Sequence, residues 1–212
     1  MDKLKKIAIG IGIIGVVIMT VLVGNGSVAG FDATWDGAVI GLRGPGLNTL
    51  VEMFTYVGNW QTVVILCLLL VAYESTRRSY GIPVTAVAIV SSVSNRILKD
   101  IMQIPRPDAA NMLIQQGGYS FPSGHTATFT AIMLLLIGLL IKNKPEKFGK
   151  KSKSVILGIV FVLLTVLMGF SRVYLGVHHT SDIIAGWLIG LASFAIVSVG
   201  WDIYQKKHPI EE

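Results

Sequence analysis

Three short polar clusters stand at the ends of apolar segments, and their residue types suit phosphoryl transfer. A phosphate carries spread negative charge that several donors must stabilise, and exchange of its ester oxygen needs a nucleophile and an acid. The clusters supply three cations, two imidazoles and a carboxylate. In chain order they are Lys99 with Arg106-Pro107, then Pro122-Ser123-Gly124-His125, then Ser171-Arg172 with His178 and Asp182.

The middle cluster predicts an anion site at the start of a helix. Ser123 suits an N-cap, and Gly124 lets a ligand approach the backbone amides at the positive end of the helix dipole. His125 would stand beside the bound anion. The simpler alternative is an ordinary helix start with a surface histidine, which this tetrapeptide alone does not exclude.

The last cluster joins two apolar segments through a connection of about ten residues that also holds His179. Asp182 suits the job of an N-cap, which is common for Asp at a helix start. It also suits acceptance of a hydrogen bond from one nitrogen of His178, which would leave the other nitrogen free to attack. The two roles are compatible, and His179 has no assigned role.

The first cluster lies at a helix end, because Pro105 and Pro107 cannot continue a helix. Lys99 is expected about one turn inside that end, and Arg106 at the rigid break, so both cations would reach one anion. Alternatively, each cation is an interfacial anchor that snorkels to lipid headgroups.

The elements that position these clusters are apolar enough to cross a membrane. The chain is 52% hydrophobic and 14% charged, with a mean hydropathy of +0.67. We expect an all-α, polytopic membrane protein with a bundle of six transmembrane helices, formed as one domain over residues 1–212. The expected helices are Ile7–Val23, Asn59–Tyr73, Ile82–Ile101, Thr126–Ile141, Val155–Phe170 and Ile183–Ile203. The first is alternatively a signal peptide, since Lys residues precede it and Ser27-Val28-Ala29 resembles a cleavage site.

Charge predicts the orientation. Most of the 18 Lys and Arg residues fall at the chain ends and in the connections after the second and fourth segments, and the largest block runs from Lys142 to Lys153. By the positive-inside rule that side is cytoplasmic, with both termini, and the clusters face outward. The basic block sets topology and touches anionic lipid, so we expect no nucleic-acid partner.

Two further features concern packing. Gly186 and Gly190 form a GxxxG motif that we assign to packing within the bundle, with a weaker version at Gly10, Gly12 and Gly15. The connection from Gly24 to Gly58 holds a helix-like stretch, Leu47–Tyr56, that suits the membrane interface or a lid. Cys67 is alone, so a disulfide framework and a Cys-based metal site are excluded.

The three clusters resemble the signatures of the type-2 phosphatidic acid phosphatase superfamily, in its lipid phosphatase branch, whose core is similar to vanadium haloperoxidases and class A bacterial acid phosphatases. The signatures read Lys, six residues, Arg-Pro; Pro-Ser-Gly-His; and Ser-Arg, five residues, His, three residues, Asp. The chain matches them from Lys99 to Asp182 without a departure in identity or spacing. Size and crossings resemble the small bacterial members, particularly the type-B phosphatidylglycerophosphate phosphatases and the undecaprenyl pyrophosphate phosphatases.

The resemblance implies roles for these residues. His178 would be the nucleophile that forms a phosphohistidine, Asp182 its orienting partner, and His125 the acid that protonates the leaving alkoxide and then activates water. The phosphate would be held by Lys99, Arg106, Ser123, Gly124 and Arg172. It implies an enzyme of the bacterial cell membrane, with no cofactor, no metal and no obligate protein partner, acting on phosphatidylglycerophosphate, on undecaprenyl pyrophosphate, or broadly on both.

Two rival functions remain. A zinc enzyme is one, since His125, His178, His179 and Asp182 are metal-ligand types; the nearby cations favour an oxyanion over a divalent cation. A lipid or anion transporter is the other, because intramembrane charges also mark transport paths. Hydrolysis of a phosphate ester by the purified protein would exclude the transporter.

Overall fold

The computed structural model describes residues 2–143 and 151–208, and within these ranges the chain forms helices and no strand. Its elements are α1 (Asp2–Gly24), α2 (Ala29–Ile40), α3 (Pro45–Thr55), the 3-10 helix η1 (Tyr56–Gly58), α4 (Trp60–Ala72), α5 (Glu74–Thr76), the π-helical η2 (Arg77–Gly81), α6 (Ile82–Met102), the 3-10 helix η3 (Ala109–Asn111), α7 (Gly124–Asn143), α9 (Lys151–Tyr174) and α10 (Thr180–Lys207). The expectation of an all-α fold is therefore confirmed.

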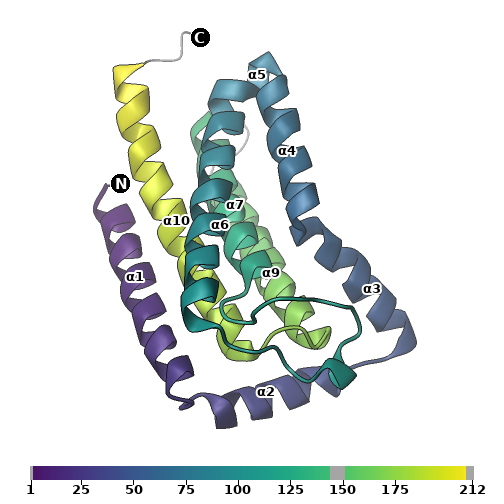
Figure 1. Ribbon diagram of the computed structural model, residues 1–212. Helices are drawn as coiled ribbons and strands as arrows, with labels where there is room; N and C mark the ends of the chain where they lie inside the picture. The colour runs from purple at the N-terminus through teal and green to yellow at the C-terminus, as the bar shows by residue number, and fades with distance from the viewer. Residues whose placement is uncertain (1, 144–150, 209–212) are drawn as a thin grey trace.

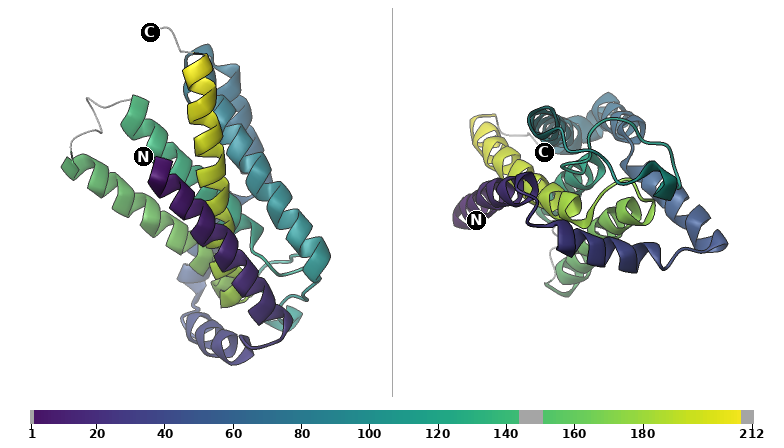
Figure 2. Two further views of the ribbon diagram at one scale, coloured as in Figure 1. Left: turned by 90° about the vertical axis from the view of Figure 1, so that its left-hand side faces the viewer. Right: turned by 60° about the horizontal axis from the view of Figure 1, so that its bottom comes forward.

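The long helices run lengthwise in one bundle, and α2 lies across one end of it (Figure 1). The connections 103–123 and 175–179 lie at this same end, which we call the site end. The start of α1 and the end of α10 both point to the opposite end (Figures 1 and 2). This arrangement is the one expected for an even number of crossings.

Five helices are long and apolar enough to span a membrane, and a bent pair brings the number to six if it counts as one span. The bent pair is the second span that the sequence predicted. Its straight part, α4, has only 13 residues, which reach about 20 Å of a hydrocarbon core of about 30 Å. The remainder is Pro45–Gly58, inclined by 47° to α4. The interfacial stretch expected at 47–56 is therefore mainly α3, the other half of this broken span.

The other boundaries follow local chemistry. The α6 helix ends at Met102, where Gln103 takes a left-handed conformation with φ 48° before the two prolines. The α9 helix continues to Tyr174, past the Phe170 boundary expected from the sequence, so the loop before α10 is shorter than we expected. Most of the basic connection predicted between the fourth and fifth segments, residues 144–150, lies outside the described residues.

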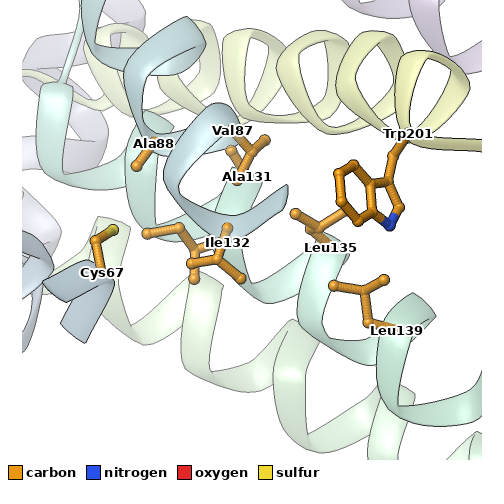
Figure 3. Close-up of a cluster of buried hydrophobic side chains, with 9 residues drawn as sticks. Cys67, Val87, Ala88, Ala131, Ile132, Leu135, Leu139 and Trp201 are labelled. Atoms are coloured by element: carbon orange, nitrogen blue, oxygen red, sulfur yellow. The ribbon is translucent and has the colours of Figure 1, made fainter. Parts of the chain in front are cut away.

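The largest buried apolar cluster lies between α4, α6, α7 and α10, and it includes Val87, Ile132 and Trp201 (Figure 3). Many other large apolar side chains, among them nearly the whole outward face of α1, are exposed on the outside of the bundle. Such a surface suits a lipid solvent, since lipid chains cover apolar side chains that water would not.

Small residues bring α10 close to its neighbours. A Cβ atom at Gly190 would lie 2.6 Å from Thr130 Cβ, and one at Gly186 would lie 2.9 Å from the Ser123 carbonyl oxygen, so α10 and α7 touch through their backbones. A Cβ at Gly12 would lie 2.7 Å from Ala192 Cβ. The prediction of packing within the bundle is confirmed for Gly186, Gly190, Gly12 and Gly15, whereas a Cβ at Gly10 would meet nothing within 4 Å. The Gly186 contact joins α10, which follows His178, to the turn at Ser123 from which α7 begins.

Candidate active site

The three sequence clusters meet at the site end of the bundle. Lys99 comes from the last turn of α6, Arg106 from the connection after it, His125 from the first turn of α7 and Arg172 from the last turn of α9. His178 lies in the loop before α10. These residues come from four helix ends that the bundle brings side by side (Figure 1).

His178 and Asp182 form a buried pair. Their side chains are 3% and 1% exposed, and His178 Nδ1 lies 3.0 Å from Asp182 Oδ2. The same carboxylate oxygen accepts hydrogen bonds from the His179 backbone N–H, at 2.9 Å, and from the Ser120 hydroxyl. Asp182 is the third residue of α10, whose N-cap is His179. Asp182 therefore supports the helix start from inside the first turn and holds His178 as well.

The electrostatic surroundings keep His178 neutral. Burial lowers the pKa of His178 well below its ordinary value, and the cations Arg172, Lys99 and Arg106 lower it further. A proton on the ring would add a further positive charge beside these cations, which is unfavourable. A bound oxyanion would instead balance their charge. At neutral pH the imidazole thus keeps a free lone pair, which is the form a nucleophile needs.

The second nitrogen of His178 faces Arg106. Arg106 Nη1 lies 3.3 Å from His178 Nε2 and donates a hydrogen bond of 2.6 Å to the Val177 carbonyl. Its Nε donates to the Gly117 carbonyl at 3.1 Å. Burial lowers the pKa of Arg106, and the Asp182 carboxylate opposes that shift. A bound anion would relieve the cost of holding this partly buried cation.

The other two cations are held by neutral groups. Lys99 Nζ donates to the carbonyls of Tyr119 and Ser120, both at 2.7 Å. Arg172 is 1% exposed. It donates to Thr55 Oγ1 at 2.6 Å and to Gln116 Oε1 at 3.1 Å.

The positive charge of these three cations is not balanced by acidic side chains of the described residues. In the part of the chain that the structure describes, Lys99, Arg106 and Arg172 form no ion pair with a carboxylate. Arg172 Nε is buried there without any hydrogen-bond partner. Buried donors and charges are costly unless they are paired, so this arrangement fits an oxyanion.

The start of α7 is set as the sequence predicted, with one addition. Ser123 precedes the helix, and its hydroxyl lies 3.5 Å from the Thr126 N–H and 3.0 Å from the Thr126 hydroxyl. Asn95 donates to the Pro122 carbonyl at 3.0 Å, which fixes this turn against α6. His125 Nε2 lies 2.7 Å from Asn59 Oδ1. Asn59 was not among the residues that the sequence singled out.

Two carboxylates of α2 hold the first turn of α10. Asp32 accepts from the Ser181 N–H at 2.8 Å and from its hydroxyl at 2.7 Å. Asp36 accepts from the Thr180 N–H at 2.9 Å. Its other oxygen lies 2.7 Å from His179 Nδ1. Negative groups are favourable at a helix N-terminus, so α2 fixes the turn on which Asp182 lies.

Sequence reasoning missed the neutral and acidic partners that support the site, which are Asp32, Asp36, Thr55, Asn59, Gln116 and Ser120. No spacing signal marks them, because each reaches its partner across a distance of many residues in the chain. His179, to which the sequence assigned no role, ties α10 to α2. Among residues 2–143 and 151–208 no group of three or more His, Cys, Asp or Glu side chains could hold a metal ion.

Comparison with known proteins places the chain in a class. The sequence model of the PAP2 superfamily matches residues 80–205. The chain therefore belongs to the PAP2 superfamily, as the three signatures indicated, and it is a multi-pass membrane phosphatase.

Particular relatives cover most of the chain. It is 30% identical over 189 residues to phosphatidylglycerophosphatase B of Bacillus subtilis (strain 168), which covers 87% of this chain and 90% of that protein. It is 31% identical over 151 residues to an undecaprenyl-diphosphatase of Sulfolobus acidocaldarius, with 68% and 66% covered.

Solved structures share the fold. A crystal structure of a transmembrane PAP2-type phosphatidylglycerolphosphate phosphatase from Bacillus subtilis matches with a TM-score of 0.80 and 26% identity, covering 93% of this chain and 96% of that one. LpxE of Aquifex aeolicus matches with a TM-score of 0.64 at 23% identity, covering 79% and 94%, which shows the common fold alone.

Proposed function

We propose that this chain hydrolyses a phosphate monoester or diphosphate of a membrane lipid through a phosphohistidine on His178. One observation carries the proposal. His178 is tied through Nδ1 to Asp182, while its other nitrogen faces Arg106. The cations of the site have no carboxylate partner among the residues that the structure describes. The pair provides a nucleophile in the correct tautomer, and the cations provide the charge that a phosphoryl group requires.

The reaction runs in two steps. First the Nε2 lone pair of His178 attacks phosphorus, the bond from phosphorus to the lipid alkoxide breaks, and His125 gives that oxygen a proton. Then water attacks the phosphohistidine and passes a proton to His125, the P–N bond breaks, and inorganic phosphate leaves. Asp182 holds the proton on Nδ1 of His178 throughout.

The remaining site residues stabilise the phosphoryl oxygens. Lys99, Arg106 and Arg172 supply positive charge, and the Gly124 N–H at the start of α7 supplies a backbone donor. The Ser123 hydroxyl joins them by turning from Thr126 toward the substrate. Since these groups account for charge stabilisation and proton transfer, we expect activity to persist in the presence of a chelator.

The substrate proposal follows the relatives. We favour phosphatidylglycerophosphate, because a relative that matches 87% of this chain is a phosphatidylglycerophosphatase. Undecaprenyl pyrophosphate is the second candidate, because another relative is an undecaprenyl-diphosphatase. Both lipids place a phosphate at the bilayer surface, where helix ends such as those of the site lie.

The site end is proposed to face outward from the bacterial cell membrane. Among the described residues, Lys5 of α1 and Lys142 of α7 both pair with Asp202 near the end of α10, opposite the site end. The positive-inside rule assigns such a basic end to the cytoplasm. A cysteine placed at Leu113, which is 39% exposed at the site end, should react in intact cells with a thiol reagent that does not cross membranes. If that cysteine reacts only after the cells are broken, the site end faces the cytoplasm and the proposed orientation is wrong.

Phosphate release from purified protein tests the function. The assay compares phosphatidylglycerophosphate, undecaprenyl pyrophosphate and phosphatidic acid, with chelator present. In parallel, the protein is quenched during turnover of a lipid with a labelled phosphate, and the label that stays on the protein is measured after treatment with acid and with base. We expect turnover of at least one lipid and a label that is lost in acid and retained in base, as a phosphohistidine requires. Turnover with no trapped label in rapidly quenched samples would oppose the covalent step, and no turnover of any lipid would favour a transporter.

A further inference from the structure

The break in the second span, where η1 separates α3 from α4, contributes two side chains to the site. Thr55 accepts a hydrogen bond from Arg172 at 2.6 Å, and Asn59 Oδ1 lies 2.7 Å from His125 Nε2. The residues at the break therefore face the site and do more than allow a bend of the span.

Asn59 holds the N-cap position of α4, but its side chain caps nothing in that helix. An N-cap Asn ordinarily accepts a hydrogen bond from an amide in the first turn of its own helix. Here the backbone turns with bonds from Asn59 N–H to the Tyr56 carbonyl at 3.1 Å and from Val63 N–H to the Asn59 carbonyl at 3.0 Å. The Thr62 hydroxyl donates to the same Tyr56 carbonyl at 2.7 Å. The Asn59 amide is thus left for His125.

The ring of His125 is also held by packing at the break. A Cβ atom at Gly58 would lie 3.1 Å from His125 Cδ2 and 2.9 Å from Met168 Sδ. The backbone of η1 therefore lies against the imidazole edge, and the hydrogen bond from Nε2 sets the rotation of the ring.

We propose that Asn59 is a positioning residue that fixes the proton of His125 on Nε2 and so makes Nδ1 the atom that gives and takes the catalytic proton. A carbonyl oxygen can only accept a hydrogen bond, so Oδ1 requires a proton on Nε2 whether the ring is neutral or protonated. In the described part of the chain, Nδ1 has no hydrogen-bond partner among the side-chain bonds of His125. The imidazolium form then protonates the leaving alkoxide from Nδ1–H, which leaves a neutral ring with its proton on Nε2. Nδ1 later receives the proton of the attacking water, which restores the imidazolium, and Asn59 itself loses and gains nothing.

The inference rests on the proposed role of His125 as the acid. Substrates with different leaving groups separate a loss of acid catalysis from general damage to the site. An alkoxide needs a proton as its bond to phosphorus breaks, whereas 4-nitrophenolate leaves without one. The experiment therefore measures kcat/KM, which reports the first step, for an alkyl phosphate and for 4-nitrophenyl phosphate. Damage to folding or to phosphate binding lowers both values by the same factor.

The variants are Asn59→Leu and Asn59→Ala, which lose the accepting oxygen, and Asn59→Asp, which keeps one. Thr62→Val is the matched control, because it removes a hydrogen bond of the same break without touching His125. We expect Asn59→Leu and Asn59→Ala to lower kcat/KM for the alkyl phosphate by about tenfold or more, which is a part of the usual rate contribution of a general acid. For 4-nitrophenyl phosphate we expect kcat/KM to fall by less than about threefold. Asn59→Asp should recover part of the loss, and Thr62→Val should show no leaving-group dependence.

His125→Ala distinguishes failure of the inference from failure of the mechanism. If His125→Ala slows the alkyl phosphate selectively and the Asn59 variants slow both substrates equally or neither, the positioning role of Asn59 is wrong. If His125→Ala slows both substrates equally, then His125 is not the acid and the proposed mechanism fails first. In the double variant His125→Ala with Asn59→Ala, the loss should match that of His125→Ala alone.

Discussion

His178 and His125 are held by partners of opposite kinds. His178 bonds to the carboxylate of Asp182, which itself accepts from the His179 N–H and from Ser120. His125 bonds to the neutral amide of Asn59 and packs on the backbone of Gly58. A negative partner stabilises the positive ring that forms when a nitrogen attacks phosphorus. A neutral partner leaves the ring able to give up and recover a proton, as an acid and base must do.

The supporting structure differs in the same way. The nucleophile's turn is fixed by the α2 carboxylates, Asp32 and Asp36, so its framework is charged. The framework of His125 is uncharged and consists of the broken span, with the glycine backbone at Gly58 and the amide of Asn59. If the proposed mechanism is correct, removal of a charged partner should lower the rate more at His178 than removal of a neutral partner does at His125.

The largest effect is expected for His178→Ala, which removes the nucleophile. Activity should fall by at least about a thousandfold, since the remaining groups bind phosphate without a covalent route. The protein should stay folded in detergent, because His178 lies in a loop and Asp182 keeps its hydrogen bonds from the His179 N–H and from Ser120. Thermal unfolding and phosphate release would be measured together, with His208→Ala near the end of α10 as the control. Retained turnover would end the assignment of His178.

Asp182→Asn comes next, because it gives His178 the kind of partner that His125 has. We expect kcat to fall by about a hundredfold to ten-thousandfold, since an amide neither balances the developing positive ring nor secures the tautomer. The control is Asp100→Asn, whose carboxylate pairs with Arg96 on the exposed surface. A rate near that of the unmodified protein would leave Asp182 with a purely structural role in the first turn of α10.

A smaller effect is expected for Asp32→Asn, which tests how far the charged framework extends. Burial raises the pKa of Asp32, and hydrogen bonds from Ser181 oppose that shift. The amide keeps one acceptor for Ser181 and loses the other, so stability should fall by about 1 kcal/mol and kcat by several-fold. Unfolding temperature and kcat would be compared. A loss of stability without any change in kcat would separate α2 from catalysis.

The smallest effect concerns the pair of His179 and Asp36. The hydrogen bond with Asp36 raises the pKa of His179, and burial partly opposes this. Because the folded-state pKa is raised, the stabilisation is fully present below about pH 6.5, the ordinary value, and is lost as pH rises through the raised pKa. Solvent screens the pair, so the contribution should be below about 1 kcal/mol.

The unfolding temperatures of the unmodified protein and of His179→Gln would be followed between pH 5 and 8 to test this pair. Their difference should shrink as pH increases, while His208→Gln, an exposed control, should track the unmodified protein. A difference that is constant with pH would show that the pair contributes no charge-dependent stability.

Much of the site could be predicted from the sequence because its residues lie in short segments with recognisable residue types and spacing. Pro122-Ser123-Gly124-His125 specifies a helix start by itself, and His178 lies only four residues before Asp182, in the loop that leads into α10. The cations Lys99, Arg106 and Arg172 stand out since charged groups near membrane depth are costly unless they serve a site. The residue roles in catalysis stay predictions until the variants are measured.

The prediction was less complete for the second span and for the partners of the site. The apolar run from Asn59 to Tyr73 gave a straight helix, but hydropathy does not report the 47° bend that joins α3 to α4. Asn59, Thr55 and Asp36 look like ordinary loop or cap residues. Their contacts depend on how helices far apart in the chain pack, and composition carries no signal of that.

The sequence by itself therefore determined the family, the all-helical membrane architecture and the identity of the clustered polar residues, because hydrophobic length and local helix-end chemistry act within short segments. Only the tertiary structure decided which neutral or acidic group each histidine meets. Gly186 and Gly190 let α10 touch α7, and the broken span places Asn59 against His125. These contacts arise from the close packing of whole helices, which no single segment specifies.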